Sequence, residues 1–83
     1  MDGKVALAND VRRAVDTCYW TAKFRISVES NGGNFIILKG ITSTFYQKQM
    51  AQEAAMKVLR QSDFDNSLQI QNEIYVNFTK DYF

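Results

Sequence analysis

The chain has 83 residues, a formal net charge of +1, no histidine and a single cysteine. Its length is that of one domain with a modest core, since single cores commonly serve about 50 to 200 residues. The hydrophobic content of 46% and charged content of 23% exclude a disordered chain. The near-neutral charge argues against a dedicated nucleic-acid binder, and one cysteine excludes an internal disulfide.

The first expected element is a helix over residues 5–18. One of its faces is apolar, with residues at spacings of three and four: Ala8, Val11, Val15 and Cys18. Cys18 is therefore expected to be a core residue, and no histidine is present to activate it as a nucleophile. Tyr19 and Trp20 follow, and packing at the corner before the next strand is favoured over anchoring at a lipid interface.

From residue 23 the period of hydrophobicity changes to two, which is typical of a half-buried strand. A Ser-Asn-Gly-Gly-Asn segment then permits a tight reversal, and the returning strand spans residues 35–41. A three-residue loop at 31–33 places Ile36 on the same inner face as Ile26. A two-residue turn would invert the two faces, because a slip of one residue flips every side chain. We prefer the first register.

A second helix is expected over residues 44–60 and a third strand over residues 68–76, joined by a polar loop at 62–67. The candidate N-caps are Thr42, Ser43 and Thr44. The apolar stripe of the helix comprises Tyr46, Met50, Ala51, Ala54, Ala55, Val58 and Leu59. Asn72 has the inward parity of the strand, so its amide needs hydrogen-bond partners. The order α-β-β-α-β predicts one α+β domain over residues 1–83, with a three-stranded mixed sheet and two helices packed on one face.

The sequence contains no recognisable catalytic constellation. Without histidine, the commonest general base and metal ligand are both missing. The Asp63-x-Asp65-Asn66 segment lacks the glycine and the final glutamate of a calcium loop, because Leu68 and Ile74 occupy those positions. We therefore predict a protein that is not an enzyme and has no catalytic residues, no cofactor and no metal site.

The outer face of the predicted sheet is the candidate binding surface. In the preferred register three apolar residues form its centre and charged residues border them, and such patches often mark contacts with membranes, partners or other copies. The candidate binding residues are Arg25, Phe35, Ile37, Lys39 and Tyr75. The alternatives are that these apolar residues are scattered surface hydrophobicity without a binding role, or that the C-terminal aromatic residues cover this face: Phe78, Tyr82 and Phe83.

Three segments resemble the BON domain, a small bacterial module of order α-β-β-α-β. They are residues 35–41 (Phe-Ile-Ile-Leu-Lys-Gly-Ile), 46–55 (Tyr-Gln-Lys-Gln-Met-Ala-Gln-Glu-Ala-Ala) and 70–76 (Ile-Gln-Asn-Glu-Ile-Tyr-Val). Gly40 and Asn72 match the family's glycine and asparagine, whereas the family's short Gly-Val turn before the last strand is absent. The resemblance implies a non-enzymatic module that contacts a phospholipid membrane surface or a protein or envelope partner.

The second helix is also similar, less closely, to the last helix of a double-stranded RNA-binding domain, through Lys48 and residues 54–59. That family grips phosphates with paired lysines and ends at this helix, and both departures argue against RNA. A structural or oligomerisation module is a further alternative. We expect no signal peptide and no transmembrane segment. Cytoplasm is then the default compartment, although the resembling family is often exported.

Overall fold

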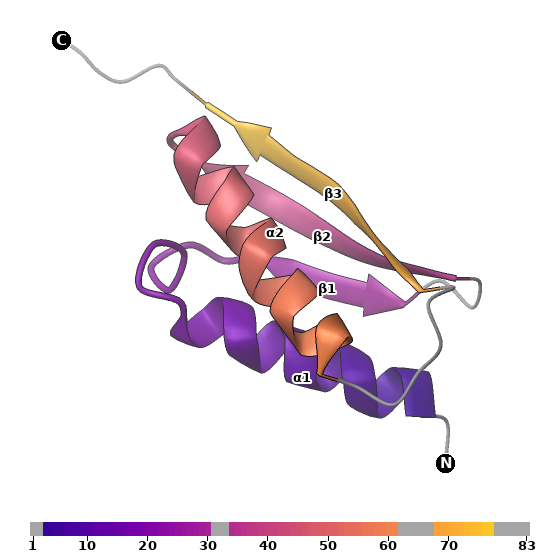
Figure 1. Cartoon of the computed structure of the whole chain (residues 1–83). Helices are drawn as coiled ribbons and strands as arrows, with labels where there is room; N and C mark the ends of the chain where they lie inside the picture. The colour runs from indigo at the N-terminus through magenta and orange to yellow at the C-terminus, as the bar shows by residue number, and fades with distance from the viewer. Residues whose placement is uncertain (1–2, 31–33, 62–67, 78–83) are drawn as a thin grey trace, which may run out of the picture.

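The computed structural model describes residues 3–30, 34–61 and 68–77. The elements in chain order are α1 (Gly3–Thr17), β1 (Ser27–Ser30), β2 (Phe35–Thr42), α2 (Phe45–Arg60) and β3 (Gln69–Val76). The strands form one sheet in the order β1-β2-β3, with β1 antiparallel and β3 parallel to β2. Both helices lie on the same face of this sheet (Figure 1), so the predicted α+β architecture is confirmed. The predicted 62–67 loop and the C-terminal aromatic residues lie outside the described residues.

The core fills the space between the two helices and the inner face of the sheet. Its buried members are Leu7, Val11 and Val15 of α1, Ala51 and Ala55 of α2, Ile36 and Leu38 of β2, Ile74 of β3, and Ile26 before β1. Small alanine side chains let α2 approach the strands closely, which fits the dense packing of protein interiors. Cys18, expected in the core, is only partly buried because α1 ends one residue before it.

A capping box starts α2. The Oγ1 atom of Thr44 accepts a hydrogen bond from the Gln47 N–H at 3.1 Å. In return, Gln47 Oε1 accepts the N–H groups of Thr44 at 3.1 Å and Ser43 at 2.9 Å. This reciprocal arrangement satisfies backbone donors that the first helical turn cannot pair. Of the three candidate N-caps, Thr44 is the one used.

β1 begins at Ser27 rather than at residue 23, because the chain makes turns after α1. The N–H of Thr21 donates to the Cys18 carbonyl at 3.1 Å. The Thr21 side chain is buried, and its Oγ1 donates to the Val15 carbonyl at 2.8 Å. These two bonds hold the turn against the end of α1. Because this turn delays the start of the strand, the hydrophobic alternation that begins at residue 23 precedes β1.

The hairpin keeps the predicted faces with a different pairing. A three-residue loop would set Ser30 opposite Asn34, whereas the structure pairs Ser30 with Ile36 and Ser27 with Lys39. The difference is two residues, and a shift of two leaves every side chain on its original face. The predicted parity is therefore confirmed, although the predicted loop length is wrong.

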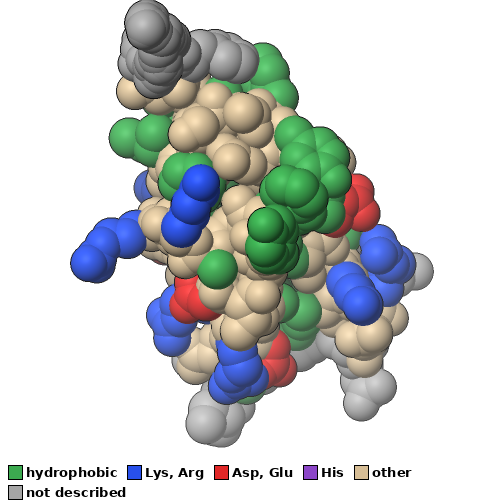
Figure 2. All heavy atoms as spheres, turned by 90° about the vertical axis from the view of Figure 1, so that its left-hand side faces the viewer, with side chains coloured by type: hydrophobic (Ala, Val, Ile, Leu, Met, Phe, Trp, Pro, Cys, Tyr) green, Lys and Arg blue, Asp and Glu red, His purple; other side chains and the backbone are tan. Residues whose placement is uncertain are grey.

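Exposed apolar side chains are concentrated at one end of the molecule. This end gathers the turn after α1, the start of α2 and the last residues of β2 and β3, on the left of Figure 1. Figure 2 views it directly and shows hydrophobic side chains near the centre, with both basic and acidic side chains around them. We call it the aromatic end. Of the seven exposed large hydrophobic residues in the described part of the chain, it carries six: Tyr19, Trp20, Ile41, Phe45, Tyr46 and Tyr75.

Candidate binding surfaces

The outer face of the sheet carries the predicted binding residues. Phe35, Lys39 and Tyr75 are exposed on strands whose inward neighbours are buried, and Ile37 is partly buried on the same face. Arg25 is exposed two residues before the start of β1, outside the sheet. The four residues on the strands therefore belong to the side of the sheet that the helices leave open.

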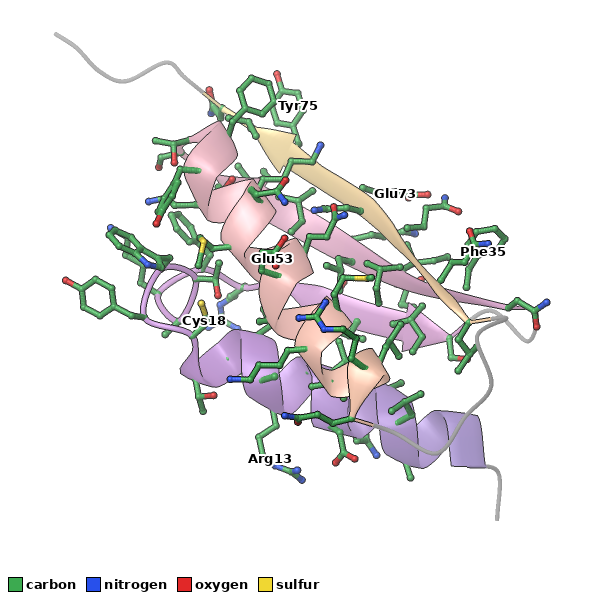
Figure 3. The ribbon with its side chains drawn as sticks, viewed as in Figure 1. Arg13, Cys18, Phe35, Glu53, Glu73 and Tyr75 are labelled. Carbon is green, nitrogen blue, oxygen red and sulfur yellow. The ribbon has the colours of Figure 1, made fainter. Side chains whose placement is uncertain are left out.

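These residues do not form the single apolar centre that was predicted. The parallel register sets Tyr75 beside Ile41 at the end of β2, whereas Phe35 pairs with Gln69 at its start. Figure 3 shows Phe35 and Tyr75 at opposite ends of the sheet. The prediction failed because strand direction cannot be read from the periodicity of β3, and a parallel pairing separates these two side chains. Ile41, 57% exposed, was missed as a surface residue.

A charged band divides the two apolar ends of this face. The ammonium of Lys39 lies 3.5 Å from the Glu29 carboxylate, and Lys39 also stands opposite Glu73 in the sheet. Glu73 accepts a hydrogen bond from the neighbouring Gln71 side chain. Exposed ion pairs of this kind contribute little to stability, about 0–1 kcal/mol. Their effect here is to keep the middle of the outer face hydrated.

The aromatic end has ordered internal contacts. The rings of Tyr19 and Trp20 meet edge to face with centroids 5.0 Å apart and an interplanar angle of 88°. Trp20 meets Tyr46 in the same way, at 5.0 Å and 89°. Edge-to-face contact is a preferred geometry for aromatic pairs and fixes the relative orientation of the rings. Trp20 thus packs at the corner as expected, yet it remains 40% exposed.

Tyr46 was assigned to the apolar stripe of the second helix, and that assignment is wrong. It lies in the first turn of α2 and is 55% exposed, where it contacts Trp20 instead of the sheet. Phe45 beside it is also exposed. Two consecutive aromatic residues cannot both face inward on a helix, since neighbours differ by about 100° in direction. That pair was the sequence signal for a surface at this end.

The pocket at the aromatic end has a volume of about 280 Å³. It is lined by Tyr19, Trp20, Lys23 and Gln47, from the turn after α1 and the first turn of α2. Its position depends on the packing of α1 beside α2, so sequence periodicity could not locate it.

The described residues contain no grouping of three His, Cys, Asp or Glu side chains that could hold a metal ion. Glu53 and Glu73 are both exposed and come from α2 and β3 respectively (Figure 3). Within residues 3–30, 34–61 and 68–77, no helix combines the length and the hydropathy required to cross a bilayer.

Comparisons of the chain with protein-family models, curated proteins and solved structures find no match. The resemblances to the BON domain and to the double-stranded RNA-binding domain stay predictions from the sequence. The described surface has two notable features. The open face of the sheet has a charged middle, and at one end this face is continuous with a group of exposed aromatic residues.

Proposed function

We propose that this chain is a non-enzymatic binding module that docks on an anionic phospholipid surface through its aromatic end and the adjoining half of the sheet's outer face. The observation that supports this is the gathering of six exposed large hydrophobic side chains at one end. Tyrosine and tryptophan have an apolar body and a polar tip, which suits the boundary between lipid and water. No other end of the described molecule has a comparable surface.

The charges around this end support an anionic surface. The segments that build it, residues 17–28, 40–52 and 74–77, contain three basic residues and no aspartate or glutamate, and the acidic residues that directly adjoin them are Asp16, Glu29, Glu53 and Glu73. The basic residues are Lys23, Arg25 and Lys48. Each lysine or arginine near an anionic membrane contributes about 1 kcal/mol at physiological ionic strength. Together with aromatic insertion, three such residues supply the two kinds of attraction that reversible membrane binding needs.

Under this proposal, only some of the predicted binding residues belong to the docking surface. Arg25 and Tyr75 belong to the docking surface, and Lys39 lies at its border in the charged band. Phe35 and Ile37 lie at the other end of the sheet and take no part. Phe35 is therefore a matched control, because it is also an exposed aromatic residue on the same sheet face.

Co-sedimentation with vesicles tests the proposal. The protein should pellet with phosphatidylglycerol-containing vesicles at low salt, and less with pure phosphatidylcholine. Tyr75→Ser and Tyr19→Ser should each weaken binding by several fold, since each removes roughly 1–2 kcal/mol of apolar contact. Phe35→Ser should leave binding unchanged. Absence of pelleting with anionic vesicles at low salt would rule out the membrane and leave a protein partner or self-association as the function of this surface.

A further inference from the structure

One polar residue that lines the pocket at the aromatic end, Gln47, already uses its side-chain oxygen in hydrogen bonds to the backbone. Gln47 Oε1 accepts the N–H groups of Ser43 and Thr44 in the capping box. The amide is planar, so fixing Oε1 on the backbone also fixes the direction of the Nε2 group. No acceptor among residues 3–30, 34–61 and 68–77 takes a hydrogen bond from Nε2. Gln47, a lining residue of the pocket, therefore has its acceptor occupied and its Nε2 donors unused by the described residues.

The other polar groups of the pocket are also donors. The Lys23 ammonium has no acidic partner in the described part of the chain, and it lies 5.5 Å from the centroid of the Phe24 ring. The indole N–H of Trp20 can only donate, whereas the phenol of Tyr19 can both donate and accept. Donors therefore predominate in this lining, and a ligand that brings acceptors suits it best. A cationic ligand is disfavoured by Lys23, although the walls are aromatic.

The size and charge of the pocket limit the ligand further. Its volume of about 280 Å³ lies just below the usual range of ligand pockets, which begins near 300 Å³. One basic residue lines it, and the net charge of the whole chain is +1. These values suit one anionic group rather than a polyanion. Aromatic side chains at the same opening favour a flat or apolar body next to that group.

We infer that this pocket binds a small organic acid, with its carboxylate at Lys23 and Gln47 Nε2 and its apolar body against Tyr19 and Trp20. Charge-assisted hydrogen bonds to a carboxylate are roughly twice as strong as neutral ones, so the charged head supplies the selectivity. This inference concerns a soluble ligand and does not depend on membrane docking.

The chain's single tryptophan is a specific reporter of this site, because Trp20 is part of the lining. Phenylacetate is the probe, titrated against the full chain while Trp20 fluorescence is recorded. For about ten non-hydrogen atoms we expect a Kd on the order of 1 mM. Phenylacetamide has the same shape without the charge, and it should bind at least about tenfold more weakly. No change in fluorescence up to about 50 mM phenylacetate, or equal binding of the amide, would overturn the inference.

Gln47→Glu is the decisive variant. A glutamate at this position still accepts the backbone N–H groups of Ser43 and Thr44, since glutamate is a standard partner in a capping box. Its second oxygen replaces the Nε2 donors with a negative charge. Phenylacetate affinity should fall at least about tenfold, while thermal unfolding shows that the helix is retained. Unchanged phenylacetate affinity in a folded Gln47→Glu protein would overturn the inference.

Two further variants complete the experiment. Lys23→Gln removes the ammonium without touching the capping box, and it should also lower affinity about tenfold. Gln69→Glu makes the same chemical change at the far end of the sheet, opposite Phe35. Its effect on affinity should stay within about twofold, because salt screens charges at that separation. If Gln69→Glu weakens binding as much as Gln47→Glu, the effect is one of net charge and the site is wrong.

Discussion

At the scale of single residues, Gly40 shows what one missing side chain permits. Its φ angle of 151° lies in a region that residues with a Cβ rarely adopt. A Cβ atom built there would lie 2.8 Å from the Arg25 carbonyl oxygen and 2.9 Å from the Ile26 side chain. The chain before β1 therefore crosses closely over β2 at this point. Gly40 allows that approach, and the β1–β2 ladder ends one residue away, at Lys39.

Gly40→Ala should lower the free energy of unfolding by about 2 kcal/mol or more, because the substitution adds both backbone strain and a contact with backbone that cannot move freely. Urea denaturation followed by circular dichroism measures this. Ile41→Ala, at the exposed neighbouring position, is the control and should cost much less. A Gly40→Ala protein as stable as the parent would show that the close approach is not required.

Asn72 is the second residue with a defined structural role. Its Nδ2 donates to the Lys48 carbonyl at 3.1 Å and to Gln52 Oε1 at 3.2 Å, and its Oδ1 accepts the N–H of Ile74 at 3.2 Å. The expectation that this inward amide needs partners is confirmed. These bonds tie β3 to α2, and they also occupy one N–H of β3, which is an edge strand of the sheet.

Asn72→Ala should destabilise the domain by about 1–3 kcal/mol, the usual cost of leaving partly buried polar groups unpaired. Asn72→Asp should cost more at neutral pH, because a carboxylate would face the Lys48 carbonyl oxygen where the amide now donates to it. Chemical denaturation of both variants at the same pH gives the order. A smaller cost for the aspartate would mean that Nδ2 contributes little.

At the scale of elements, β2 separates core from surface by alternation alone. Ile36 and Leu38 are fully buried under the helices, whereas Ile37 between them faces the open side and is only partly buried. The element has the same residue type on its two faces at consecutive positions. That makes it a direct test of whether the outer face is separate from the core.

Ile36→Ala should cost about 2–5 kcal/mol, the range for truncating a buried isoleucine. Ile37→Ala should lower the free energy of unfolding by about 1 kcal/mol or less, since the partly buried Ile37 side chain loses few packing contacts. Denaturation midpoints of the two variants, measured in parallel, decide this. Equal losses would mean that Ile37 is a core residue and that the outer face is not free to bind.

At the scale of the whole molecule, the two ends of the domain differ in the number of large hydrophobic side chains that they expose. One end combines aromatic side chains with three basic residues, and the middle of the sheet's outer face holds the Glu29–Lys39 ion pair. An asymmetric surface of this kind orients a small domain at a boundary. In the proposed membrane docking, apolar insertion and charge attraction act at the same end.

Salt should therefore weaken vesicle binding without removing it. Raising NaCl from about 0.05 M to about 0.5 M shortens the screening length from roughly 14 Å to roughly 4 Å, which suppresses the contribution of the three basic residues. Binding to anionic vesicles should fall about tenfold or more and approach the level seen with neutral vesicles. Binding that is indifferent to salt would show that the basic residues play no part.

The sequence by itself determined the features that depend on neighbouring residues. The alternation in residues 35–41 predicted which side chains of β2 face the helices, because opposite pointing of successive residues is a local property of a strand. The need of Asn72 for partners followed in the same way, and so did the order of elements. For the cap of the second helix, the sequence offered three neighbouring candidates, of which the structure uses Thr44.

Only the tertiary structure decided which of these elements lie side by side. The parallel pairing of β3 with β2 put Tyr75 next to Ile41 instead of Phe35, and the packing of α1 beside α2 brought Trp20 to Tyr46. Periodicity has no information on strand direction or on partners distant in the chain. Strand direction and distant partners depend on which arrangement buries the most apolar surface while pairing every backbone group. That choice involves the whole chain at once.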